Sequence, residues 1–431
     1  MAKKKMTLEE KLEEAIVKDA PYEVPDNWIN VKLNSIVKFE KGKKPKILID
    51  DFEDKAIPYV TIKYFQTKEA DQYTFETETN RLCKEDDILI VWDGARAGLI
   101  GTGVKGALGS TLCNIRFDDI NKKFMYYYFL SKYDLINSNT KGTGIPHVDP
   151  SYLDTLVLSI PPLKEQQRIV DRIESLFEKL DKAKELIEEA RDDFEKRKSA
   201  ILEKAFRGKL TKAWRSNNLV DYNSTWTKHV FSNIAKVKSN LVQPQDFLKY
   251  PHIAPDNIEK KTGKLLAYRT IEEDNVKSAK HRFYPGQIIY SKIRPYLSKV
   301  VIVDFEGLCS ADMYPIETDL DTKYLYYYML SDTFIDFASN SGSRSVLPKI
   351  NQKELGKINV PVCSINEQKE IVRILDKLLE EEAKIDELTA LEEQIELIKK
   401  SILAKAFRGQ LGTNSEDDES VIELLKEILN K

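Results

Sequence analysis

The sequence predicts an α+β protein: two similar domains of mixed helix and strand, joined by two long antiparallel coiled-coil helices in a pseudo-two-fold dumbbell. Three observations predict this architecture. The chain repeats itself at an offset of about two hundred residues. Two segments carry the apolar spacing of a coiled coil. Each half also contains short apolar runs punctuated by glycine and proline, such as residues 87–91 and 287–290.

The internal repeat is clearest where the two long helical segments end. The sequence Ala-Phe-Arg-Gly-Lys-Leu at 205–210 recurs at 406–411 as Ala-Phe-Arg-Gly-Gln-Leu. Within the domains, the tyrosines at 126–128 have counterparts at 326–328, and Trp28 lies near the position of Trp226. Residues 91–98, in contrast, differ from residues 291–298. We therefore expect two domains that share a scaffold but present different side chains.

Two segments carry a coiled-coil seam, regular in the first and looser in the second. Prolines at 161, 162 and 361 precede the segments and glycines at 208 and 409 follow them, which fits the chemistry of helix starts and stops. Helices over 165–206 and 367–407 would each span roughly 60 Å. Because they match in length, we favour an antiparallel pair over a generic helical bundle. The predicted seam residues are Ile169, Ile173, Leu176, Leu180, Ala183, Ile187, Ala190 and Phe194 in the first helix, and Ile371, Leu375, Leu378, Ile385, Leu388, Ile395, Ile398 and Ile402 in the second.

These patterns divide the chain into seven segments. They are an N-terminal amphipathic helix (1–20), a first globular domain (21–161), a first central helix (162–207), a linker (208–225), a second globular domain (226–361), a second central helix (362–408), and a C-terminal tail with a short helix (409–431). Thr7 and Glu10 form a capping box at the start of the N-terminal helix. We expect the two terminal helices to come together or to dock on a partner, the alternative being two surface helices on their own domains.

The composition restricts the function. The formal net charge is −3 and the pI is about 6.0, so the protein lacks the basic field of non-specific nucleic-acid binders. The four cysteines and four histidines are scattered, which argues against a disulfide framework or a metal site. No apolar stretch approaches the roughly 18 residues of a membrane span, and the polar start does not fit a signal peptide. We therefore expect a soluble, cytoplasmic protein.

Local basic clusters are the candidate contacts with DNA phosphates and bases. The first contains Lys41, Lys43, Lys44 and Lys46, and the second contains Lys292, Arg294 and Lys299. Arg96 and Arg294 each follow a strand-like run. An arginine fork can read a guanine edge in the major groove. Arg344 is the last candidate for DNA contact. The alternative is ordinary solvated or ion-paired side chains. For the tyrosine triplets we favour packing over base stacking.

The sequence contains no convincing catalytic motif. Residues 149–152, Asp-Pro-Ser-Tyr, superficially match an adenine methyltransferase motif, but the second proline and the glycine-rich cofactor loop are missing, so we interpret them as a helix-start turn. Asp256 and Glu259 are too close in sequence to flank a nuclease metal from separate strands. A phosphate-binding Gly-x-x-x-x-Gly-Lys-Ser/Thr loop is also missing. We expect no catalytic residue and no metal site in this chain.

The chain resembles the DNA-specificity subunits of type I restriction-modification systems over nearly its full length. The resemblance rests on Pro-Asp-Asn-Trp at 25–28, on Pro-Pro-Leu-Lys-Glu-Gln at 161–166, on the two Ala-Phe-Arg-Gly helix ends, and on residues 291–297 with 309–312. The second helix start departs from the pattern, but Glu367-Gln368 keeps the register.

This resemblance implies two target-recognition domains that read the two halves of an asymmetric double-stranded DNA site, with the helices fixing the half-site spacing. It also implies two modification subunits that methylate adenine with S-adenosylmethionine, and two restriction subunits that translocate and cleave DNA with ATP and Mg²⁺, with none of these cofactors bound by this chain. A coiled-coil scaffold with duplicated protein-binding domains is the main alternative, and a cryptic enzyme is the second.

Overall fold

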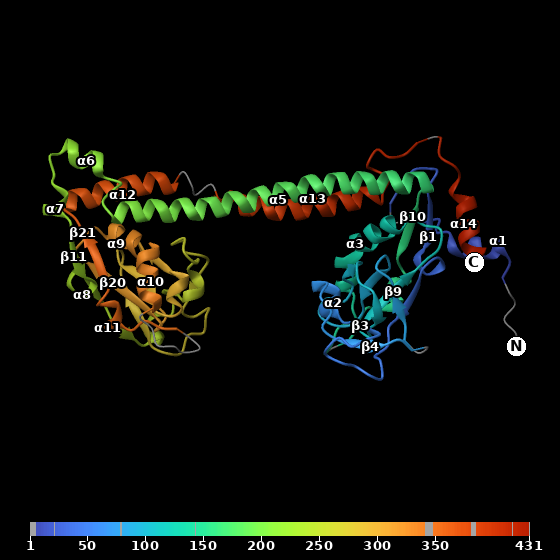
Figure 1. Ribbon diagram of the computed structural model, residues 1–431, viewed down its shortest axis with the longest axis horizontal. Coiled ribbons are helices and arrows are strands. Elements are labelled where there is room, and N and C mark those ends of the chain that lie inside the picture. The colour runs from blue at the N-terminus through green and yellow to red at the C-terminus, as the bar shows by residue number, and fades with distance from the viewer. Residues whose placement is uncertain are drawn as a thin grey trace. The chain divides into compact units, whose positions relative to one another are not determined.

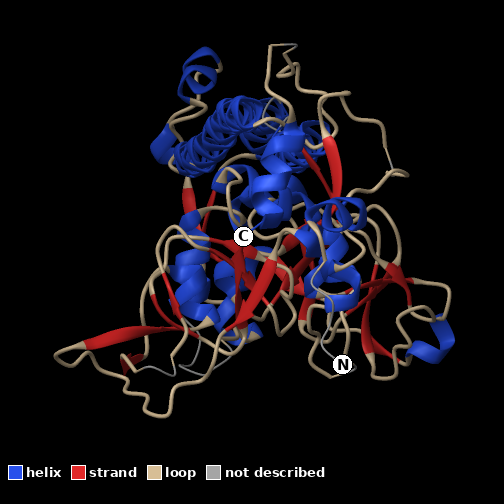
Figure 2. Cartoon of the chain, turned by 90° about the vertical axis from the view of Figure 1, so that its right-hand side faces the viewer, coloured by secondary structure: helices blue, strands red, loops and turns tan. Residues whose placement is uncertain are grey.

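The computed structural model describes residues 6–20, 22–77, 80–142, 144–340, 348–380, 385–415 and 417–430. The chain forms two compact units. Unit 1 contains residues 1–185 and 391–431, and unit 2 contains residues 186–390. Helices, strands and loops are mixed along the chain, as the α+β prediction requires (Figure 2). Each unit therefore includes part of both long helical segments, and the C-terminal tail belongs to the same unit as the N-terminus.

Unit 1 contains three small sheets. The first pairs β1 (Ile29–Lys32) with β10 (Val157–Ile160) in antiparallel fashion. The second has the order β2 (Lys38–Lys41), β9 (Leu112–Arg116), β6 (Ile88–Val91), β7 (Ile100–Gly101). The third has the order β4 (Tyr73–Phe75), β3 (Ala56–Val60), β8 (Gly106–Leu108), β5 (Leu82–Cys83), in which β3 and β8 are parallel.

Unit 2 repeats these three sheets. The antiparallel pair consists of β11 (Thr227–Val230) and β21 (Asn359–Val362). The second sheet has the order β12 (Ala235–Val237), β20 (Met313–Thr318), β17 (Ile288–Ser291), β18 (Val300–Ile302). The third has the order β13 (Leu241–Val242), β16 (Lys280–Phe283), β19 (Gly307–Cys309), β14 (Pro251–Ile253), β15 (Arg269–Thr270), with β14 and β19 parallel. The duplicated topology confirms the internal repeat predicted from the sequence.

Shorter helices accompany the sheets in each unit. Unit 1 has α2 (Ile62–Thr67), α3 (Lys122–Ser138) and α4 (Pro150–Leu153). Unit 2 has α6 (Lys212–Asn217), α7 (Tyr222–Thr225), α8 (Phe231–Ile234), α9 (Thr322–Met329), α10 (Asp332–Asn340) and α11 (Gln352–Leu355). Asp149 caps α4 through the backbone N–H of Ser151, so residues 149–152 are a helix start, as interpreted from the sequence.

The first long helix, α5 (Leu163–Phe206), is continuous and lies within one residue of each end of the predicted segment 162–207. The second long segment is described as α12 (Ile365–Glu380) and α13 (Ile385–Ala406). In unit 1, Phe177 and Asp181 of α5 contact Lys399 of α13, whereas Ile169 and Ile173 share a core with Leu403 and Phe407. Residue numbers rise along one helix as they fall along the other, so the two helices are antiparallel there (Figure 1).

In unit 2, the end of α5 packs in the same antiparallel sense against α12. Leu202, Ala205 and Phe206 share a core with Ile371 and Leu375. The burial of the predicted seam is graded: Ile169, Ile173, Ile187, Leu375 and Ile395 are buried, and Leu176, Leu180 and Leu378 are half-buried. The side chains of Ile385 and Leu388 lie outside the described residues. Ala190 and Ile398 are exposed, so their assignment to the seam was wrong. The apolar spacing of the second helix is too loose to decide which of its residues face the partner.

The two terminal helices pack together in unit 1. α1 (Leu8–Ala15) begins with the predicted capping box of Thr7 and Glu10. α14 (Val421–Asn430) buries Val421, Leu425 and Ile428 in the same core that contains Ala15 of α1. The Lys11 ammonium group also donates a 2.5 Å hydrogen bond to the carbonyl of Leu429. The expectation that the terminal helices come together is therefore confirmed (Figure 1).

Candidate nucleic-acid interface

In unit 1 the loop that follows β6 is held by backbone hydrogen bonds to two other loops. The N–H of Trp92 donates to Thr111 at 2.8 Å, and the carbonyl of Trp92 accepts from Val148 at 2.9 Å. Two residues further on, the N–H of Gly94 donates to Pro146 at 2.8 Å. These three bonds fix the base of the loop and leave its tip, with Arg96, exposed.

Unit 2 holds the loop that follows β17 in the same way. The N–H of Lys292 donates to Asp312 at 3.0 Å, and its carbonyl accepts from Ile350 at 2.9 Å. The N–H of Arg294 donates to Pro348 at 2.8 Å. Because only backbone groups form these bonds, the same loop frame tolerates different side chains. The two units therefore present unlike residues from one common frame.

A second exposed segment of unit 1, residues 42–47, follows β2 and carries Lys43, Lys44 and Lys46. The backbone at Gly42 lies so close to another loop that a Cβ there would sit 2.2 Å from the carbonyl oxygen of Gly109. Only glycine fits this approach, which ties the lysine segment to the sheet. Lys41 at the end of β2 differs from the other three, because its ammonium group forms a 2.9 Å ion pair with Asp93. The exposed ammonium groups available to phosphate are thus those of Lys43, Lys44 and Lys46.

Ion pairs also order the loop that Gly94 contacts. Asp93 lies 3.5 Å from the His147 ring, and Lys141 forms a 2.8 Å ion pair with Asp149. The hydrogen bond from Lys141 holds the pKa of Asp149 below its ordinary value, which keeps this carboxylate charged. The loop frame of unit 1 is therefore stabilised by side chains as well as by backbone bonds.

Two of the predicted basic residues hydrogen-bond to the backbone of unit 2 itself. The ammonium group of Lys299 donates a 2.7 Å bond to the carbonyl of Pro255, and its side chain is only 15% exposed. The ammonium group of Lys292 donates a 2.6 Å bond to the carbonyl of Ala311 and lies over the ring of Tyr314. Lys292 and Lys299 are therefore less accessible than Arg294, because backbone carbonyls from distant loops bind them, and their contact with DNA stays a prediction.

The arginine candidates differ from these lysines. Arg96 and Arg294 are exposed, and neither guanidinium group forms a hydrogen bond or ion pair with any residue that the structure describes. Arg344 lies outside the described residues. Arg96 and Arg294 are therefore the predicted guanine-reading side chains whose donors remain available.

The tyrosine triplets are packing residues, as favoured from the sequence. Tyr128 is fully buried and donates a 3.0 Å hydrogen bond to the carbonyl of Val157. Its counterpart Tyr328 donates a 2.6 Å bond to the carbonyl of Asn359. Burial raises the pKa of Tyr328 to about 12, so its hydroxyl stays protonated at neutral pH. Each tyrosine anchors its helix to the two-stranded sheet of its unit.

The Glu-Gln pair at the start of each long helix is buried, a role that the sequence analysis missed. Gln166 accepts a 2.9 Å bond from the backbone N–H of Asn121, which caps α3, and donates a 2.9 Å bond to the carbonyl of Pro161. Gln368 makes the same two bonds with Asp321, which caps α9, and with Cys363. The motif therefore fixes each long helix to the tyrosine-rich helix of its unit.

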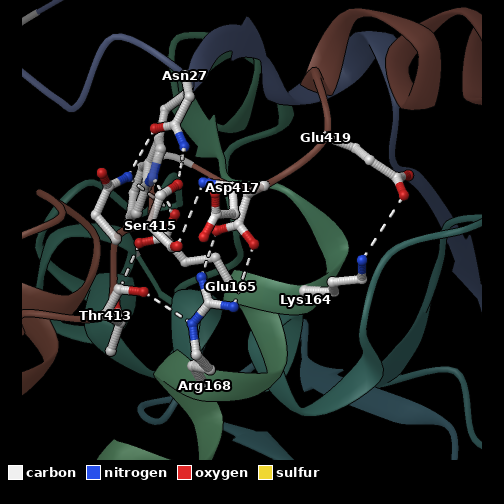
Figure 3. Close-up of polar contacts among 11 residues, drawn as sticks. Asn27, Lys164, Glu165, Arg168, Thr413, Ser415, Asp417 and Glu419 are labelled. Carbon is white, nitrogen blue, oxygen red and sulfur yellow. Dashed lines mark hydrogen bonds and ion pairs between the residues drawn. The ribbon is translucent and has the colours of Figure 1, made fainter.

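Glu165, which precedes Gln166 on α5, binds residues from both the N-terminal and the C-terminal parts of the chain (Figure 3). Glu165 is fully buried, accepts a 2.9 Å bond from the indole N–H of Trp28, and lies 3.1 Å from the hydroxyl of Thr413. Arg168, one turn further along α5, forms a bidentate ion pair with Asp418. The start of α5 thus binds both Trp28 and the segment that contains Thr413 and Asp418.

Glu367 has the corresponding place in unit 2. It is fully buried, accepts a 2.6 Å bond from the hydroxyl of Thr211, and pairs with the buried Arg215. The Arg215 guanidinium group also lies over the ring of Tyr222. The linker between the two halves of the sequence therefore binds the helix-start glutamate of unit 2, with Arg215 in place of the indole that binds Glu165 in unit 1.

The fold and the loops define a class of protein: two recognition units of one topology, with dissimilar exposed loops on a common frame. The chain belongs to the family of the type I restriction modification DNA specificity domain, whose model matches residues 25–191 and again residues 223–396. It is a DNA-sequence-recognising specificity subunit of a type I restriction-modification system.

Two curated relatives support this assignment. The chain is 35% identical to the type I restriction enzyme EcoDI specificity subunit of Escherichia coli over 409 residues, which cover 90% of this chain and 89% of the relative. It is 26% identical to the MjaVIII specificity subunit of Methanocaldococcus jannaschii over 420 residues, with coverage of 90% and 94%. A solved chain from work on complex assembly and conformational transition of the type I R-M system matches 90% of this chain and all of its own length, with 18% identity and a TM-score of 0.67.

Among the described residues, no group of His, Cys, Asp and Glu side chains is arranged to hold a metal ion. None of the described helices is long and apolar enough to cross a membrane. The four cysteines are buried, and burial raises the pKa of Cys113 to about 12, so its thiol is a protonated core group.

Proposed function

We propose that each unit reads one half of an asymmetric, bipartite DNA site, and that the chain itself performs no catalysis. The observation that carries this proposal is the duplicated loop frame with unlike side chains at its tip. Two copies of one surface would read a symmetric site, whereas two different surfaces read two different half-sites. The loops after β6 and β17 differ at every side chain from 92–98 to 292–298, although the three backbone bonds that hold the base of each loop are equivalent.

The catalytic steps belong, in this proposal, to partner subunits. Two modification subunits would methylate adenine with S-adenosylmethionine, and two restriction subunits would translocate and cleave DNA with ATP and Mg²⁺. The chain would act in the cytoplasm with these partners. Family membership supports this division of labour.

The charge of the chain predicts that its affinity for DNA depends on its partner subunits. The net charge is −3, and among the candidate lysines of unit 1 the cluster of Lys43, Lys44 and Lys46 is small. Binding to DNA depends strongly on the number of phosphates that a protein neutralises. We therefore expect the chain alone to bind DNA weakly and with little sequence preference, and modification subunits to raise its affinity sharply. Gel-shift titrations at fixed salt would measure both, and tight specific binding by the chain alone would contradict this expectation.

Mapping of methylated adenines tests the function itself. The gene would be expressed with the modification subunit of its host in a strain that lacks other adenine methyltransferases. We expect methylation at one bipartite, asymmetric sequence, and none when this chain is omitted. Methylation that does not depend on the chain would favour the scaffold alternative. Turnover by the purified chain with S-adenosylmethionine or a metal would show that the chain is itself an enzyme.

A further inference from the structure

The loops after β6 and β17 share an unusual backbone conformation. At the third and seventh positions after β6, Gly94 and Gly98 have φ values of 110° and 94°. At the same positions after β17, Arg294 and Ser298 have φ values of 47° and 43°. Both units thus require left-handed residues at two equivalent positions. Unit 1 has glycine at both positions, and glycine adopts this conformation readily. Unit 2 has residues with a Cβ at both positions.

The structure explains the residue at the second of these positions. A Cβ at Gly98 would lie 2.9 Å from the side chain of Ile136, so this position points into unit 1. Its counterpart Ser298 is buried in unit 2, where its hydroxyl donates a 3.3 Å hydrogen bond to the carbonyl of Met329. The left-handed conformation of Ser298 is therefore compensated by a bond inside the fold.

The first position has no such compensation. A Cβ at Gly94 would have no neighbour within 4 Å, so this position points away from the protein. Arg294 is exposed there, and its guanidinium group contacts no partner among the described residues. The bond that its N–H makes to Pro348 is also made by a glycine in unit 1. The left-handed conformation is unfavourable for a residue with a Cβ. Among the described residues, no contact of the Arg294 side chain compensates for this cost. In a loop whose counterpart in unit 1 has glycine at the same position, such a residue indicates a function outside the chain.

The tip of the loop also differs between the units. Arg96 lies at the tip in unit 1, and the equivalent residue in unit 2 is Tyr296, within a 3₁₀ turn at Pro295–Leu297. Tyr296 is 47% exposed. Unit 1 thus presents one guanidinium group at the tip, whereas unit 2 presents a guanidinium group at the start of the loop and an aromatic ring at its tip.

Resting on the proposed function, we propose that Arg294 and Tyr296 together determine the specificity of the second half-site, with Arg294 reading a guanine. The guanidinium fork matches the O6 and N7 acceptors of guanine in the major groove. The ring of Tyr296, two residues away, contacts the adjacent base, through its face or its hydroxyl. Arg96 supplies the corresponding guanine contact in the first half-site, without an aromatic neighbour at the loop tip.

Three substitutions of Arg294 separate its side chain from its backbone. Arg294→Gly removes the guanidinium group and relieves the left-handed conformation, Arg294→Ala removes only the guanidinium group, and Arg294→Lys keeps the charge but cannot form the fork. The matched control is Leu219→Gly, because Leu219 has a φ of 53° and is 95% exposed. The variants would be assembled with modification subunits, and their binding measured on duplexes in which each base pair of the mapped site is replaced in turn.

We expect all three Arg294 variants to lose discrimination at one G·C pair of one half-site by roughly 5- to 150-fold, while the other half-site is read as before. Tyr296→Ala should relax an adjacent position of the same half-site. Arg294→Gly should melt no lower than the native chain and above Arg294→Ala. Leu219→Gly should leave DNA discrimination unchanged.

Two results would overturn the assignment. If Arg294→Lys keeps full discrimination and all variants weaken binding equally on every duplex, Arg294 contacts a phosphate and not a base. If Arg294→Gly lowers both the melting temperature of the chain and its affinity for every duplex, the Arg294 side chain stabilises the fold and does not read a base. Failure of the proposed function would give a different result from failure of the Arg294 assignment, because the native complex would then show no sequence preference on any duplex.

Discussion

The buried glutamines at the helix starts show how much of the fold depends on single side chains. Gln166 and Gln368 each bind one backbone N–H and one backbone carbonyl from a neighbouring element. A buried polar group that loses its partner costs about 1–3 kcal/mol. Each glutamine therefore contributes to the attachment of a long helix to its own unit.

Gln166→Leu should lower the free energy of unfolding of unit 1 by about 1–3 kcal/mol, because it leaves the N–H of Asn121 and the carbonyl of Pro161 without partners. Hydrogen–deuterium exchange should speed up over residues 122–138 and not over residues 322–329. Gln368→Leu should give the reverse pattern. The control is Ser175→Ala, an exposed residue further along the same helix, with an expected change within about 0.5 kcal/mol. Equal effects of the Gln166 and Ser175 variants would contradict this account.

The sequence alone could not separate structural from exposed residues at the candidate interface. Arg294 and Lys299 belong to one basic cluster in the sequence, yet Lys299 binds the carbonyl of Pro255 while Arg294 is exposed. The difference arises from a contact between segments more than forty residues apart, which no local pattern encodes. The internal repeat, in contrast, predicted that the loops carrying Arg96 and Arg294 are equivalent, because matching positions in two related domains stand out without a structure, and their backbone bonds confirm this equivalence.

At the scale of elements, the terminal helices complete unit 1. α14 buries its apolar face against α1 and the unit 1 core, and the tail before it is bound by Glu165 and Arg168. The amphipathic patterns predicted both helices, but they could not choose between mutual packing and two separate surfaces. That choice depends on where the chain ends meet, which the fold of the intervening residues determines.

Leu425→Ala should lower the free energy of unfolding of unit 1 by about 2–5 kcal/mol, as expected for a fully buried leucine. Ile422→Ala is the matched control on the same helix, because Ile422 is 47% exposed and its loss should cost much less. Urea unfolding of the full chain, followed with exchange over residues 8–15, would measure both. If α14 acted only as a docking site for a partner, the two variants would unfold alike and differ only in subunit assembly.

At the scale of the whole molecule, one helix contributes to both units. α5 runs without interruption from Leu163 in unit 1 to Phe206 in unit 2. A DNA reader with two half-sites needs a defined spacing between them. We infer that the length of the long helices sets the number of base pairs between the half-sites.

Inserting one heptad into both long helices should lengthen the preferred spacer by about three base pairs. Seven residues extend a helix by about 10 Å, and each base pair adds about 3.4 Å. A whole heptad keeps the apolar seam in phase, whereas a four-residue insertion would introduce a stutter that unwinds the coil locally. The two insertions must face each other, and the contact between Asp181 and Lys399 defines the register. Insertions after Ala183 and before Leu397 meet this requirement.

Mapping of methylated adenines would then report both half-sites and their separation for the lengthened protein. The half-site sequences should not change, because residues 94–98 and 294–298 are untouched. An insertion in α5 alone is the control, since it shifts the seam of one helix against the other and should reduce methylation without creating a new spacer. A lengthened, folded protein that methylates the original spacer would show that the helices do not set the distance, and that the DNA or the modification subunits do.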